Sequence, residues 1–107
     1  MKVVRMKSYR LAMQAMGLGK ADMKKIERMI LLAPNAHPVI KGLRGARKAR
    51  FALSEGKSFG GRAIYYAALT PDLLVMLTAY PKSVRDDLSQ EQRKSILNAL
   101  ESIKGEK

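Results

Sequence analysis

The 107-residue sequence contains no cysteine and no tryptophan, and it has only nine acidic residues. Without cysteine the chain cannot form a disulfide, a thiolate metal site or a thiol nucleophile, which fits a reducing cytoplasm. The longest apolar run, residues 73–80, is far shorter than the roughly 20 residues that a membrane-spanning helix needs. The first residues contain no apolar stretch typical of a secretory signal. We therefore expect a cytoplasmic protein.

Basic residues are present in large excess. Lys and Arg number 21 against nine Asp and Glu, which gives a formal net charge of +12. An apolar content of 47% is typical of a folded chain rather than a disordered one. The length allows one domain, residues 1–107. So strong a charge on so small a domain favours a polyanionic partner, with nucleic acid ahead of an acidic protein or a membrane surface.

Apolar periodicity predicts an α+β fold in the order strand, two helices, three strands, helix. Short connections between the three later strands favour an antiparallel meander, and the Leu- and Val-rich last strand should be central. We expect one small, mostly antiparallel sheet with the helices packed on one face. The predicted strands are residues 3–6, 47–53, 62–69 and 73–80. The first two predicted helices are residues 8–16, with Ser8 as the N-cap, and residues 23–33. The last predicted helix begins at a capping box formed by Ser89 and Gln92 and ends before Gly105.

A basic cluster surrounds the second predicted strand. Lys48 and Arg50 alternate with apolar residues and so share one face, and Arg44 and Arg47 lie close by in sequence. Residues 35–54 contain no Asp or Glu. One interpretation is a strand edge that charge protects from aggregation, and the other is a phosphate-binding face. Three further cations, Arg62, Lys82 and Arg85, border the neighbouring strands and can converge at the same end of the sheet.

An aromatic residue lies beside these cations. Tyr80 precedes Lys82 by two residues, so the two side chains can share a strand face. A ring next to a cation suits an RNA base stacked on the ring with its phosphate held by the charge. Ordinary packing of a tyrosine at a strand end is the alternative.

Other catalytic and metal arrangements find little support. His37 is the single histidine and lies in a connector, and no Ser-His-Asp set can be assembled. The Gly56-Lys57-Ser58 segment lacks the earlier glycine of a phosphate-binding P-loop. Asp86 and Asp87 are adjacent and should diverge, so Asp87 is expected to cap the last helix region or to pair with an arginine. The sequence predicts no metal and no cofactor.

Short motifs follow one another in a fixed order over residues 42–100. They are G-L-R and A-R-K-A-R-F-A (42–44 and 46–52), G-K (56–57), G-G-R-A-I-Y-Y (60–66), Y-P-K-S (80–83) and D-L-S (87–89) before a closing helix. In this order they resemble the RelE/HigB group of type II toxin–antitoxin toxins. Pro81 stands where that group usually has alanine.

The resemblance implies a RelE/ParE-like fold and a metal-independent, ribosome-dependent mRNA endoribonuclease that inhibits translation. It also implies a cognate antitoxin that covers the basic surface in a hetero-oligomer. It places the general base on Lys48 and transition-state stabilisation on Arg62. In general, a lysine acts as a base only where its pKa falls, and neighbouring positive charges act in that direction. The implied catalytic residues are Lys48, Arg62 and Lys82, and the expected RNA- or phosphate-binding residues are Arg44, Arg47, Arg50, Tyr80 and Arg85.

Two other functions remain open at this point. A ParE-like toxin would poison gyrase by protein binding without nuclease activity, and a basic RNA- or ribosome-binding module would not be an enzyme. The Lys48, Arg50 and Arg62 cluster favours the nuclease, since a gyrase poison needs neither a general base nor a phosphate clamp.

Overall fold

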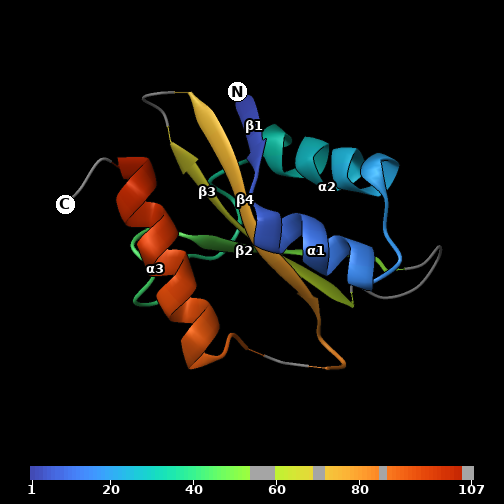
Figure 1. Cartoon of the computed structure of the whole chain (residues 1–107). Helices are drawn as coiled ribbons and strands as arrows, with labels where there is room; N and C mark the ends of the chain where they lie inside the picture. The colour runs from blue at the N-terminus through green and yellow to red at the C-terminus, as the bar shows by residue number, and fades with distance from the viewer. Residues whose placement is uncertain (54–59, 69–71, 85–86, 105–107) are drawn as a thin grey trace.

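The computed structural model describes residues 1–53, 60–68, 72–84 and 87–104 (Figure 1). The predicted order of elements is confirmed. No helix of this described part is long and apolar enough to cross a membrane. The elements are β1 (Lys2–Arg5), α1 (Lys7–Ala15), α2 (Lys20–Leu32), β2 (Arg47–Phe51), β3 (Gly61–Ala68), β4 (Leu73–Pro81) and α3 (Gln90–Lys104).

The sheet has the strand order β1-β4-β3-β2. Strands β2, β3 and β4 pair antiparallel, and β1 pairs parallel with β4. The predicted meander and the central β4 are therefore confirmed, and β1 lies at an edge of the sheet. Ile64 lies opposite Thr78 and Tyr65 opposite Met76, so Leu77 is an extra residue in β4. Such a bulge bends the strand locally and increases its twist.

Helices cover both faces of the sheet, and the prediction of one covered face is wrong. Figure 1 shows α1 and α2 on one side of the sheet and α3 on the other. Residues of β3 and β4 are buried toward both sides, because their continuous apolar runs leave two faces that need cover. The α1–α2 core includes Tyr9, Met13, Ile26, Ile30, Ala49, Ala63, Tyr65 and Met76, and the α3 core includes Ile64, Val75, Leu77, Tyr80, Leu88, Ile96 and Leu100.

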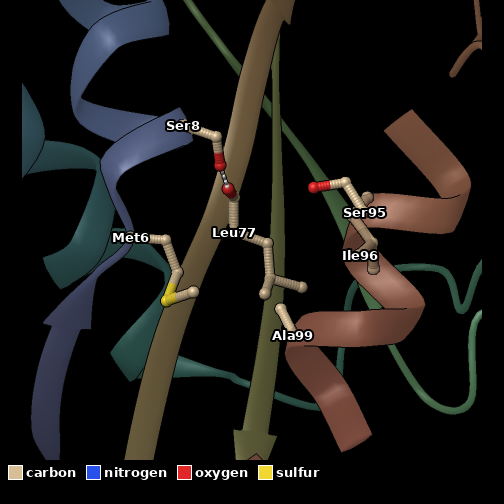
Figure 2. Close-up of a pocket in the computed structure, with 6 residues that line it drawn as sticks. All are labelled: Met6, Ser8, Leu77, Ser95, Ile96 and Ala99. Carbon is tan, nitrogen blue, oxygen red and sulfur yellow. Dashed lines mark hydrogen bonds between the residues drawn. The ribbon is translucent and has the colours of Figure 1, made fainter. Parts of the chain in front are cut away.

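The two predicted helix starts have different outcomes. The Ser89–Gln92 capping box is confirmed, since Gln92 N donates to Ser89 Oγ at 3.1 Å and Ser89 N donates to Gln92 Oε1 at 2.9 Å. Ser8 is not an N-cap, because α1 already begins at Lys7 after Met6. Its hydroxyl instead donates to the carbonyl of the bulged Leu77, which ties the first turn of α1 to β4 (Figure 2).

A small hollow of about 40 Å³ lies beside this Ser8–Leu77 hydrogen bond. A volume of this size holds about three waters and is too small for a nucleotide. Figure 2 shows it between the start of α1, β4 and α3. Its lining residues are Met6, Ser8, Leu77, Ser95, Ile96 and Ala99.

A charged cluster joins β1, α1 and α2. Glu27 is 4% exposed and faces the α1–α2 core from α2. Its carboxylate accepts hydrogen bonds from Arg5 Nε and Nη2, both at 2.8 Å, and from Tyr9 Oη at 3.2 Å. The hydrogen bond to Glu27 raises the pKa of Arg5, and burial raises the pKa of Tyr9. The bidentate geometry fixes the first strand to the second helix.

Gly61 begins β3 directly opposite Phe51, and the Phe51 ring occupies the space beside it. A Cβ at Gly61 would lie 2.4 Å from Cε1 of that ring. Gly61→Ala is expected to lower the free energy of unfolding by about 1–3 kcal/mol, because the ring must leave its packed position. Urea unfolding measures this. Gly60→Ala is the control, since among the described residues its Cβ would meet the flexible Leu53 side chain, with Cδ1 at 3.3 Å and Cγ at 3.8 Å. Equal stability of the two variants would contradict the prediction.

Candidate nucleic-acid interface

Strand register brings three predicted site residues together on one face. Arg50 in β2 lies opposite Arg62 in β3, and Arg62 lies opposite Tyr80 in β4. Side chains directly opposite one another have Cβ atoms about 4.5–5.5 Å apart. Two residues along β2, on the same face, Lys48 lies opposite Ile64. Because Ile64 and Tyr80 belong to the α3 core, this whole set projects from the α3 side of the sheet.

We name Lys48, Arg50 and Arg62 the basic face. Arg50 is exposed and Lys48 is half-buried. Arg62 is only 6% exposed, and its Nη1 donates to the carbonyl of Gly61 at 3.0 Å. The basic face therefore offers the exposed Arg50 and the half-buried Lys48 to a ligand first, with Arg62 beneath them. Clustered cations of this kind bind phosphate and can offset the charge of a phosphorane-like transition state.

Tyr80 does not offer a ring for base stacking in this structure. It is 4% exposed and packs in the α3 core with residues that include Ile64 and Leu77. The position of Tyr80 matches the alternative prediction, which was ordinary packing of a tyrosine at a strand end. Its ring supports the sheet next to Arg62 rather than opening to solvent.

Lys82 extends the basic face at the end of β4. Its backbone N donates to the Gly60 carbonyl at 2.8 Å, one step beyond the Gly61–Pro81 pair of the β3–β4 ladder. The side chain is exposed. Pro81, which stands where the RelE/HigB group usually has alanine, is the last residue of β4. Arg85, the other cation predicted here, lies outside the described residues.

The structure does not bring Arg47 to the basic face. Its guanidinium Nη1 donates to the carbonyls of Asn35 at 3.1 Å and His37 at 2.7 Å. Its register partner Tyr65 lies in the α1–α2 core, on the other side of the sheet from Lys48. Arg47 thus fixes the connector that leads into β2. Arg44 is exposed in the turn before β2, in a left-handed conformation with φ 51.

Asp87 and Arg93 border the same side of the sheet. Asp87 Oδ1 accepts from the backbone N of Leu88 at 2.8 Å, and Arg93 Nη2 lies 3.5 Å from Asp87 Oδ2, which confirms the pairing expected for Asp87. The Leu88 N–H chiefly lowers the pKa of Asp87, and the charges of Arg93 and Lys48 act in the same direction. Sequence analysis missed Arg93, whose Nη1 donates to the Lys41 carbonyl at 3.1 Å.

The described residues contain no group of three or more His, Asp or Glu that could hold an ion. The basic face carries two arginines and one lysine on the same side of the sheet. Proton transfer by a positioned side chain and charge stabilisation by nearby cations are both means of cleaving a phosphodiester.

A comparison with solved structures bears on the fold. No family model matches the chain. Among solved structures, the chain is similar to the Escherichia coli toxin RelE, determined in the free state as a mutant. The match has a TM-score of 0.58 and 14% sequence identity, and it covers 92% of this chain and 96% of that one. The chain therefore has a RelE-like α+β fold, as predicted.

Proposed function

We propose that this RelE-like chain is the toxin of a toxin–antitoxin system and an endoribonuclease that cleaves messenger RNA on the ribosome. The observation that carries the proposal is the basic face, where Lys48 and Arg50 are two residues apart on β2 and Arg62 lies opposite Arg50 on β3. Two further observations support it. The net charge is +12, and the neighbour of the same fold is a toxin by its own description.

The chemistry needs no group beyond the chain and its RNA. The 2′-oxygen of a ribose attacks the adjacent phosphorus while Lys48 Nζ removes the hydroxyl proton. The bond from phosphorus to the 5′-oxygen then breaks, and that oxygen takes up a proton from solvent water. The products are a 2′,3′-cyclic phosphate and a free 5′-hydroxyl. Arg50, Arg62 and Lys82 would offset the extra negative charge that forms on the phosphate.

The partners follow from the same proposal. The substrate is a message held on the ribosome in the cytoplasm, and the regulator is a cognate antitoxin that covers the basic surface in a hetero-oligomer. An acidic antitoxin segment would compete with RNA for Lys48 and Arg50 because both ligands are polyanions.

A translated and an untranslated reporter test the function. The two messages differ only in the start codon, and 5′ ends are mapped by primer extension after brief induction of the protein. We expect new ends within the coding region of the translated message and none in its untranslated twin. Growth arrest without new ends would favour a gyrase-poisoning toxin. Neither arrest nor new ends would favour a non-enzymatic RNA-binding module.

A further inference from the structure

A second group of cations covers the outer surface of α1 and α2. Each member is exposed. Few acids balance them, because α1 and α2 contain only Asp22 and Glu27. Glu27 is buried against Arg5, and Asp22 accepts a hydrogen bond from the backbone N of Gly19 at 2.9 Å. We name this group the helix-face cations, and its members are Lys7, Arg10, Lys20, Lys24, Lys25 and Arg28.

The arrangement on α2 costs stability. Lys20, Lys24 and Arg28 follow one another at four-residue spacing, so each pair of neighbours lies on the same side of the helix. Like charges at this spacing destabilise a helix. By contrast, α3 exposes Glu91 and Glu101 together with Lys94. Solubility alone is achieved by such a mixed surface. Helix α2 exposes four cations and one acid, Asp22, and this excess of positive charge favours a polyanionic ligand.

The helix-face cations are separate from the basic face. Helices α1 and α2 pack on one side of the sheet, whereas Lys48 and Arg50 project from the side that carries α3 (Figure 1). The sheet lies between the two surfaces. A short RNA segment bound at the basic face cannot reach both, so the helix-face cations require a second segment.

The chemistry of the helix surface selects the kind of ligand. The one aromatic residue of α1 and α2, Tyr9, is buried, so the surface offers no ring for stacking single-stranded bases. Exposed leucines are present on these helices, Leu11 on α1 and Leu31 and Leu32 at the C-terminal end of α2, but none lies between Lys20 and Arg28. Membrane-bound helices and protein interfaces both need exposed apolar side chains. The cations from Lys20 to Arg28 therefore have no ring and no apolar anchor among them, and such cations fit backbone phosphates.

We propose that the helix-face cations form a second RNA-binding surface, which takes the phosphate backbone of a double-helical RNA segment while the message occupies the basic face. On the ribosome, this second surface would hold the protein on structured ribosomal RNA, and this part of the proposal rests on the proposed function. The contact is independent of sequence and depends on salt, because it releases counterions from the RNA.

The test compares two variants of the full chain with equal charge. One variant combines Lys20→Gln, Lys24→Gln and Lys25→Gln, and the other combines Lys2→Gln, Lys41→Gln and Lys94→Gln, which are also exposed positions. The probe is a short blunt-ended RNA duplex of mixed sequence, titrated at salt concentrations from about 0.05 to 0.2 M. We expect the α2 variant to lower the slope of log Kd against log salt by about two and to weaken binding at least about tenfold at 0.1 M salt.

The control variant should keep most of the affinity and slope of the wild type. Equal losses in both variants would overturn the proposal, since net charge alone would then explain binding. Unchanged duplex binding by the α2 variant, or a loss confined to vesicles of phosphatidylserine and phosphatidylcholine, would overturn it as well. Thermal melting of both variants excludes unfolding as the cause. Cleavage of the translated reporter by the wild type is scored separately, so failure of the nuclease proposal is seen independently of duplex binding.

Discussion

Lys48→Ala is expected to slow cleavage of a ribosome-bound message by about 10²- to 10⁴-fold, the usual contribution of a general base. Lys48 lies on the same face as Arg50 and Arg62, two residues from Arg50 along β2, and is half-buried, so no other described lysine has the same position on the basic face. Alanine removes the proton acceptor and leaves both arginines in place. The measurement is a single-turnover rate with the protein in excess over ribosome complexes.

Lys94→Ala is the matched control, because Lys94 is an exposed lysine of α3. We expect its cleavage rate to stay within about threefold of the wild type, since surface substitutions away from a site change little. Both variants should melt within a few degrees of the wild type. A Lys48→Ala protein that cleaves as fast as Lys94→Ala would remove Lys48 from the mechanism.

Glu27→Ala is expected to lower the free energy of unfolding by about 3 kcal/mol, near the lower end of the effect of breaking a buried ion pair. The change leaves the Arg5 guanidinium without its bidentate partner and the buried Tyr9 hydroxyl without its acceptor. Arg5 is partly exposed, so water recovers some of the loss. For a domain of this size, the melting temperature should fall by more than about 10 °C.

Glu101→Ala serves as the control, because it removes an exposed glutamate of α3. Its melting temperature should change by no more than about 2 °C. A combined Arg5→Met, Tyr9→Phe and Glu27→Leu variant should recover much of the stability, since apolar residues can replace a buried charged cluster. A Glu27→Ala protein as stable as Glu101→Ala would show that the cluster contributes little.

Local sequence rules predicted the elements but not their layering. The capping box at Ser89 and the alternation in β2 depend on near neighbours, and both are confirmed. The run 73–80 is apolar at every position except Thr78, so it does not show which face is buried. The structure buries both faces of this strand. Ser8 is not a cap because α1 begins one residue earlier, and the bond from its hydroxyl to Leu77 is a tertiary contact that the local sequence does not show.

The candidate site was predictable in part by the same reasoning. Alternation placed Lys48 and Arg50 on one face, and the same rule places their neighbour Arg47 on the other, as the structure shows. The pairing of Arg62 with Arg50 depends on strand register, which lies beyond local rules. Glu27 did leave a signal, since it lies on the apolar side of α2 next to Ile26 and Ile30.

A message with a single 2′-deoxynucleotide at the mapped cut position gives the most direct test of the central claim. Wild-type protein is mixed with ribosomes that hold either this message or its all-ribose twin, and the product ends are identified. We predict cleavage of the all-ribose message to a 2′,3′-cyclic phosphate and a 5′-hydroxyl, and no cleavage at the deoxy position. Equal cleavage of both messages, or cleavage of neither, would contradict the claim that the basic face directs a ribose 2′-oxygen against its own phosphate.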